Sequence, residues 1–165
     1  MEFEERNPDP PNPFKQAKND EDPWVMYLIV RESLGMSAGK IGSQCAHASQ
    51  TLQYLYQKLG WEIESYLPLP HESVAYDWRN IPQDLKDKSD AFTRWIDSLA
   101  RIVVLKADDK EWEKIKSAYP DKYQKVVVVD AGLTEIEPNS ETVIGLWPQK
   151  KSQVPKILSR LQALK

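Results

Sequence analysis

The sequence predicts an α/β domain in three layers (α/β/α), with helices on both faces of a four-stranded, mixed, mostly parallel sheet. The main observation is an alternation along the chain. Short apolar runs rich in branched residues are followed by longer segments with helical periodicity, which is the order of elements in α/β proteins. The connection between the third and fourth runs is too short for a helix. That pair is therefore either antiparallel or joined by a wide loop, which predicts a mixed sheet.

The apolar runs define the expected strands, and the periodic segments define the expected helices. Residues 25–30 (VMYLIV) combine branched and aromatic side chains, as a buried strand does. A helix is predicted from about Ser37, a suitable N-cap residue, to about Leu59. The other strands are expected at 101–106, 125–129 and 142–147. The other helices are expected at 84–99, 108–118 and 153–164, the last with Pro155 in its first turn.

The 165 residues are enough for one compact domain, which we place at residues 24–165. Residues 1–23 form an acidic, proline-rich tail that we expect to be disordered, because it has few apolar residues. Residues 60–100 interrupt the alternation of elements as an aromatic-rich insertion. An insertion of this length is either functional or an added packing layer. We expect its aromatic side chains to pack against the core or a dimer partner rather than to stack on bases.

Composition excludes several classes of protein. No apolar run is long enough to span a bilayer, and the N-terminus lacks the features of a signal peptide. The single cysteine, Cys45, forms no internal disulfide, which favours a reducing, cytoplasmic location. Two histidines and one cysteine are too few for a typical zinc site, so no metal is expected.

The charge is unevenly distributed along the chain. The formal net charge is −3, of which the seven acidic and three basic residues of the tail contribute −4, leaving +1 for the rest. Residues 149–165 carry five basic residues and no acidic residue. This basic end is compatible with phosphate contacts, but equally with a helix face that complements its own C-terminal dipole.

A polar stripe runs along the first predicted helix. A helix advances about 100° per residue, so four polar side chains fall on one side and the apolar ones on the neighbouring side. The apolar side must face the sheet, which leaves the polar stripe at the sheet's rim. Gly39 and a cation near the helix start together favour a binding site for a phosphate or an oxyanion. The polar residues are Lys40, Gln44, His47 and Thr51.

Asp130 directly follows four consecutive valines, at the carboxyl end of the third predicted strand. If this strand runs parallel to the first, the carboxylate and Lys40 point into the same crevice. A carboxylate can orient or deprotonate a water while a lysine stabilises negative charge. A structural aspartate that caps a turn is the alternative, and the residues alone leave both open.

Other chemistries fit the sequence less well. A nucleotide-binding P-loop needs four residues between its glycines, whereas three separate Gly35 from Gly39, and Ile41 replaces the metal-binding hydroxyl. A Cys–His dyad is disfavoured because Cys45 and His47 fall on different sides of the helix.

Two segments carry a family resemblance. Residues 31–48 (RESLGMSAGKIGSQCAHA) and 130–145 (DAGLTEIEPNSETVIG) resemble the two signature segments of the type-2 peptidyl-tRNA hydrolases, in the same order. The resemblance implies an α/β enzyme without a cofactor, usually a homodimer, that hydrolyses the ester between a peptide and tRNA. The catalytic positions that it implies are Lys40, Gln44, His47, Asp130 and Thr134. Ser37, Gly39, Gly132, Lys150 and Lys151 are the expected substrate-binding residues.

The chain departs from the family pattern in the 60–100 insertion and at Trp147-Pro148-Gln149-Lys150, which replaces a glycine-rich turn. Gly42-Ser43 stands where the family has small apolar residues, and the overall charge is low for a tRNA-binding protein. These departures leave two alternatives to a peptidyl-tRNA hydrolase. One is a protein- or RNA-binding module with weak or no hydrolysis, which docks a partner through the insertion. The other is a hydrolase of a different ester or amide conjugate.

Overall fold

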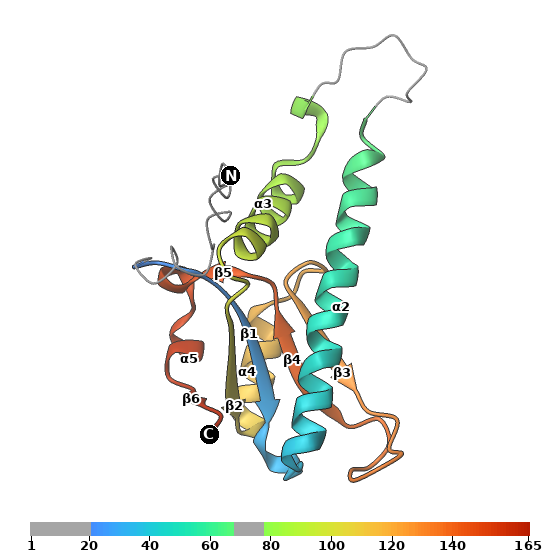
Figure 1. The fold of residues 1–165 in the computed structure, drawn as a ribbon, viewed down its shortest axis with the longest axis vertical. Coiled ribbons are helices and arrows are strands. Elements are labelled where there is room, and N and C mark those ends of the chain that lie inside the picture. The colour runs from blue at the N-terminus through green and yellow to red at the C-terminus, as the bar shows by residue number, and fades with distance from the viewer. Residues whose placement is uncertain (1–20, 68–77) are drawn as a thin grey trace, which may run out of the picture.

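The computed structural model describes residues 21–67 and 78–165, so most of the predicted tail and part of the insertion lie outside the described residues. Its middle layer is a six-stranded sheet in the order β3-β4-β1-β2-β6, with β5 paired to β1 (Figure 1). The strands are β1 (Trp24–Arg31), β2 (Ile102–Ala107), β3 (Lys125–Val129), β4 (Glu141–Leu146), β5 (Gln149–Lys150) and β6 (Gln162–Ala163). The four predicted strands are confirmed, and two short strands are added.

The sheet is mixed, as predicted. β1 pairs parallel with β2 and antiparallel with β4, and β4 in turn pairs antiparallel with β3. Three long strands, β1, β2 and β3, therefore run in one direction and β4 runs in the other. The expectation of a mostly parallel sheet needs one correction: only β1 and β2 are parallel neighbours, because β4 separates β3 from β1.

Helices cover both faces of the sheet, which gives the three predicted layers (Figure 1). In β1, Met26, Leu28 and Val30 pack in one apolar cluster with α2 and α3, whereas alternate residues such as Tyr27 and Ile29 pack with α4 and α5. This period of two is what a strand buried on both faces requires. The helices are α2 (Ala38–Glu64), α3 (Gln83–Asp97), α4 (Asp109–Ala118) and α5 (Lys156–Ser159). None of the helices in the described ranges is both long enough and apolar enough to cross a membrane.

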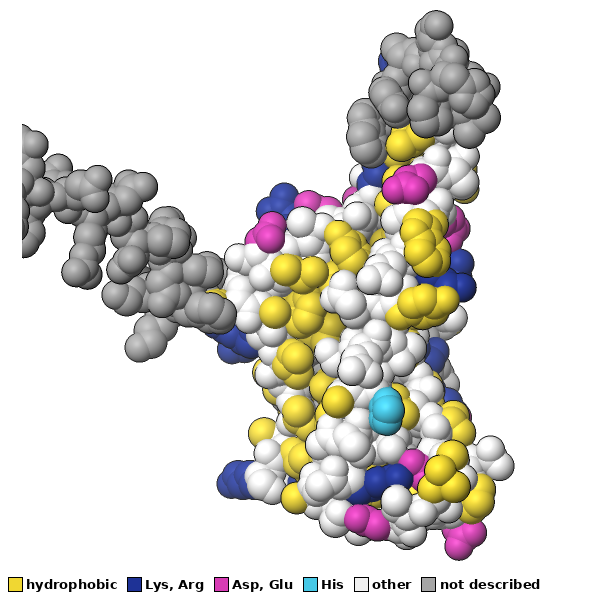
Figure 2. All heavy atoms as spheres, turned by 45° about the vertical axis from the view of Figure 1, so that its right-hand side comes forward, with side chains coloured by type: hydrophobic (Ala, Val, Ile, Leu, Met, Phe, Trp, Pro, Cys, Tyr) yellow, Lys and Arg dark blue, Asp and Glu magenta, His cyan; other side chains and the backbone are white. Residues whose placement is uncertain are grey.

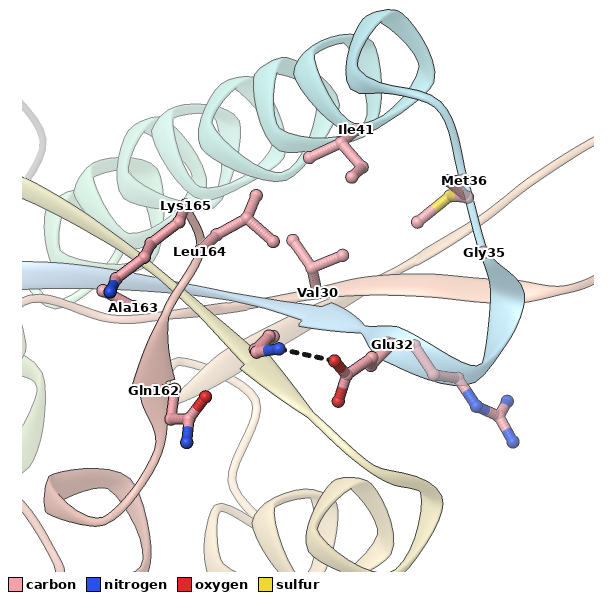
Figure 3. Close-up of a pocket in the computed structure, with 11 residues that line it drawn as sticks. Val30, Glu32, Gly35, Met36, Ile41, Gln162, Ala163, Leu164 and Lys165 are labelled. Atoms are coloured by element: carbon pink, nitrogen blue, oxygen red, sulfur yellow. Dashed lines mark hydrogen bonds and ion pairs between the residues drawn. The ribbon is translucent and has the colours of Figure 1, made fainter.

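The predicted C-terminal helix over 153–164 is wrong. The structure has a short α5 followed by β6, which pairs with β2 at the sheet edge. Leu158 packs on the α4 side of the sheet, whereas Leu164 packs on the α2 side, and one short helix cannot reach both faces. Figure 3 shows Leu164 beside Val30 and Ile41 in a hollow of about 540 Å³, which the C-terminal segment helps to close.

The described part of the 60–100 insertion is largely a packing layer. Helix α2 continues past the predicted end to Glu64, and α3 packs against it. Phe92 of α3 stacks on Tyr56 with ring centroids 4.4 Å apart and lies 4.9 Å from the ring of Trp147. The indole N–H of Trp147 also donates to the backbone oxygen of Lys88, at 3.0 Å. Two departures from the family pattern, the insertion and Trp147, are thus in contact.

We expect Leu52→Ala to lower the free energy of unfolding by about 2–5 kcal/mol, because it removes a fully buried side chain between α2 and the sheet. Denaturant unfolding followed by circular dichroism measures the change. Gln53→Ala, an exposed change on the next residue, is the matched control. Equal stability of the two variants would contradict the packing of α2 described here.

Candidate active site

An ion pair joins the start of α2 to the end of β3. The Nζ atom of Lys40 lies 2.5 Å from Oδ1 of Asp130, and the side-chain amide of Gln44 donates to the same oxygen at 2.9 Å. The two charged side chains are only 9% and 8% exposed, so little water screens their attraction. The structure therefore brings together three of the predicted catalytic residues, from two segments 90 residues apart.

The loop after β3 is shaped to hold the carboxylate. Gly132 has a φ of +74°, and its N–H donates to Oδ2 of Asp130 at 2.8 Å. A Cβ at Gly132 would lie 2.5 Å from Pro138, so both the backbone angle and the space require glycine. Thr134 follows in the same loop, and its hydroxyl accepts a hydrogen bond from Lys40 at 2.8 Å. Both predicted residues of this loop thus contact the ion pair.

Sequence reasoning missed a buried residue that orients the amide of Gln44. The hydroxyl of Thr142, on β4, donates to Oε1 of Gln44 at 2.7 Å. This bond leaves the NH₂ group to face Asp130. Thr142 is fully buried and Gln44 is only 4% exposed. The sequence placed Thr142 in the second signature segment, but nothing local indicates that it faces α2.

The start of α2 is already occupied by an internal carboxylate. Ser37 is the N-cap, as predicted, and its side chain accepts a hydrogen bond from the Lys40 N–H. Its own N–H and hydroxyl both donate to Glu135, at 2.9 Å and 2.5 Å. These bonds lower the pKa of Glu135. We predicted that Ser37 binds the substrate. In the structure its two donors instead bind Glu135, which holds the 130–140 loop against the helix.

A cavity of about 540 Å³ opens above the ion pair. Its walls include the predicted polar stripe of α2, with His47 and Thr51 exposed at the rim, and the last residues of β3. Figure 2 shows this face, with an imidazole in cyan and a basic side chain in dark blue below it. The predicted placement of the stripe at the sheet's rim is confirmed. The lining residues are Lys40, Ser43, Gln44, His47, Thr51, Val127, Val128, Val129, Asp130, Ala131, Leu133 and Thr134.

The remaining predicted residues differ in position. Gly39 lies in the first turn of α2 with no atom within 4 Å of the place where a Cβ would be, so a ligand has room to approach. Lys150 pairs with Trp24 at the opposite end of β1 from the ion pair. Its Nζ lies 3.7 Å from Asp22, and Lys151 is next to it on the exposed surface. The structure therefore does not bring the two lysines to the cavity.

The electrostatics of the site are those of a stable ion pair. The hydrogen bond from Lys40, together with the Gly132 N–H, holds the pKa of Asp130 below its ordinary value of 3.8. Asp130 is therefore a carboxylate at neutral pH. Burial raises the pKa of the Cys45 thiol, which disfavours a thiolate nucleophile. Within the described ranges, no group of three or more His, Cys, Asp or Glu side chains is arranged to hold a metal ion.

The Asp130 pKa predicts a pH dependence. Because the folded-state pKa lies below 3.8, the ion pair stabilises the fold fully above that pH, and this stabilisation is lost as pH falls through the folded-state pKa. In Lys40→Met the pKa should rise towards or above its ordinary value. The ¹³C carboxyl shift of Asp130 against pH measures both midpoints. The same midpoint in the two proteins would contradict the pairing.

Comparison with known proteins places these residues in a family. The family model described as peptidyl-tRNA hydrolase PTH2 matches residues 24–164. The peptidyl-tRNA hydrolase of Thermoplasma acidophilum is 27% identical over 141 residues, which cover 84% of this chain and 97% of that protein. Peptidyl-tRNA hydrolase 2 of Saccharomyces cerevisiae is 28% identical over 139 residues, 83% of this chain and 56% of that protein. The human peptidyl-tRNA hydrolase 2, mitochondrial, is 28% identical over 145 residues, 87% of this chain and 65% of that protein. The chain belongs to the PTH2 family of peptidyl-tRNA hydrolases.

Proposed function

We propose that this protein hydrolyses the ester bond of peptidyl-tRNA and releases a free peptide and free tRNA. Family membership supports the reaction. The observation that carries the proposal is the shielded Lys40–Asp130 pair at the base of an open cavity. Ester hydrolysis needs an oriented water and a cation near the developing oxyanion, and this pair offers both without a metal or a bound cofactor.

Asp130 orients the attacking water. Its Oδ1 atom accepts hydrogen bonds from Lys40 and Gln44, whereas Oδ2 accepts only the Gly132 N–H among the described residues. A carboxylate oxygen accepts two hydrogen bonds, so Oδ2 has room for one more donor. A lowered pKa makes Asp130 a weak base at neutral pH. We therefore assign it mainly to holding the water against the carbonyl carbon.

Lys40 stabilises the negative charge of the transition state. Its ammonium has three N–H bonds, of which Asp130 and Thr134 take two among the described residues. The third is available for the carbonyl oxygen of the ester as that oxygen becomes anionic. The water oxygen bonds to the carbonyl carbon, the bond between that carbon and the ribose oxygen breaks, and the proton that the water gives up goes to the ribose oxygen. We assign His47, which is exposed at the rim, to positioning the terminal nucleotide.

The wider assignment follows from the family and the sequence. We propose that the substrate is peptidyl-tRNA left by interrupted translation, so that the protein serves ribosome rescue in the cytoplasm. We propose a homodimer as its working form, and the 60–100 insertion as the surface for a dimer or protein partner. Lys150 and Lys151 lie away from the cavity, so any contact they make with substrate is to a distant part of the tRNA.

The test is a hydrolysis assay on the full chain. The substrate is a defined N-acetylated peptidyl-tRNA, the readout is release of free tRNA, and simple aminoacyl-tRNA is the substrate control. We expect turnover of the peptidyl-tRNA that falls with rising salt, because phosphate contacts release counterions. Asp130→Asn and Lys40→Met should each lower kcat by about 10²- to 10⁴-fold.

Lys110→Met is the matched control, because it removes a lysine from the exposed face of α4, on the other side of the sheet. Circular dichroism checks that all variants are folded. No release of tRNA by the wild-type chain would refute the function. Full activity of either site variant would remove that residue from the mechanism. Turnover that is insensitive to salt would indicate a different ester substrate.

A further inference from the structure

We propose that the free edge of β3 binds the peptide part of the substrate as an added antiparallel or parallel strand. The inference rests on the proposed function and says how its substrate is recognised. Backbone pairing with a sheet edge is independent of side chains. An enzyme that clears unfinished chains meets every peptide sequence, so the backbone is the feature that its substrates share.

The geometry places this edge beside the reacting groups. β3 is the outermost strand on its side of the described sheet and has β4 as its only strand neighbour there (Figure 1). Val127, Val128 and Val129 line the same cavity as Lys40. Asp130 directly follows Val129 in the chain, so a strand laid along β3 ends at the carboxylate. The ester carbon at the end of the peptide then lies near the Lys40–Asp130 pair.

The edge has little of the usual protection against pairing, which here amounts to one register shift between Val128 and Val129 and one lysine at its start. Natural proteins guard exposed edges with charged residues, prolines or bulges, because a bare apolar edge recruits other strands. Four of the five residues of β3 are valines, and its sole charged residue, Lys125, stands at the far end. Val129 is 54% exposed, and Leu133 just beyond it is 87% exposed. Substrate binding would explain why an exposed apolar edge lies next to the catalytic pair.

The charge of the cavity favours a peptide over a phosphate chain. The wall opposite β3 carries neutral polar groups such as Ser43, Gln44 and Thr51. The cationic side chain of the lining, Lys40, is already paired with Asp130. A run of phosphates would need unpaired cations, whereas a peptide backbone needs only hydrogen-bonding partners and apolar surface.

A second copy of the chain is the competing occupant of the edge. Pairing of two β3 edges would place a partner strand across the same lining residues, Val127 to Val129, and so cover the cavity that the substrate must enter. We therefore assign the edge to the peptide, and we use the oligomeric state as one arm of the test.

The first experiment uses peptidyl-tRNAs with N-acetylated oligoglycine chains, in which single glycines are replaced by N-methylglycine. An added strand bonds through alternate residues, so methylation should lower kcat/KM by about tenfold at every second position and have little effect between them. A flat profile, or one that falls steadily from the ester, would overturn the proposal.

The second experiment changes the edge itself. Val129→Lys introduces the kind of residue that blocks edge pairing, at an exposed position that tolerates it. We expect kcat/KM for a tetrapeptidyl-tRNA to fall at least about tenfold relative to kcat/KM for an N-acetylaminoacyl-tRNA. Val129→Thr should restore the ratio. Ile102→Lys is the matched control, because Ile102 is exposed at the start of β2, outside both the cavity and the insertion. Unchanged ratios, with dissociation of a dimer in Val129→Lys, would assign the edge to a second copy and overturn the proposal.

Failure of the proposed function is a separate outcome. If no peptidyl-tRNA is hydrolysed, amide hydrogen exchange of β3 in the presence of free N-acetyl-tetraglycine still tests the edge. Slower exchange at alternate residues of β3 would support peptide binding without that reaction. Unchanged exchange at millimolar peptide would overturn the inference.

Discussion

The pairing of Lys40 with Asp130 is the interaction on which the site depends, and the topology of the sheet makes it possible. The two residues are 90 positions apart. They meet because β3 runs in the same direction as β1, with β4 between them, and because α2 packs over β3 and β4. Both charges are shielded, so loss of either partner leaves the other poorly solvated. Gln44, Gly132 and Thr134 add hydrogen bonds that hold the pair in place.

Much of this arrangement was predictable because it is encoded locally. The strands at 125–129 and 142–147 follow from short apolar runs, and the polar stripe of α2 follows from helical periodicity. The capping role of Ser37 follows from its place before a periodic segment. Such features need only the neighbouring residues, and the structure agrees with them to within a few positions.

What was missed depends on contacts between distant segments. The bond from Thr142 to Gln44 joins a strand to a helix across 98 positions, and the bonds between Ser37 and Glu135 span the same separation. The C-terminal error has the same origin. Val154, Ile157, Leu158 and Leu161 have the spacing of a helix and pack on one face of the sheet, but Leu164 packs on the other. The spacing of apolar residues along the chain does not show which face of the sheet a side chain packs against.

The insertion extends the fold without altering the ion pair. Its helix α3 lies against the upper part of α2, where the buried ring of Phe92 contacts both Trp95 and Trp147. A glycine-rich turn in place of Trp147 would remove the ring that contacts Tyr56, Phe92 and Tyr123, so the two departures from the family pattern support one another in packing. The site at the start of α2 is built from residues outside the insertion, so the packing layer and the proposed chemistry are separable.

A double-mutant cycle between Lys40 and Asp130 tests the central claim most directly. It compares kcat/KM on one peptidyl-tRNA for the wild type, Lys40→Met, Asp130→Asn and the double variant. If the two groups act as one unit, the double variant loses about as much activity as either single variant. Losses that multiply, as they do for independent sites, would contradict the account.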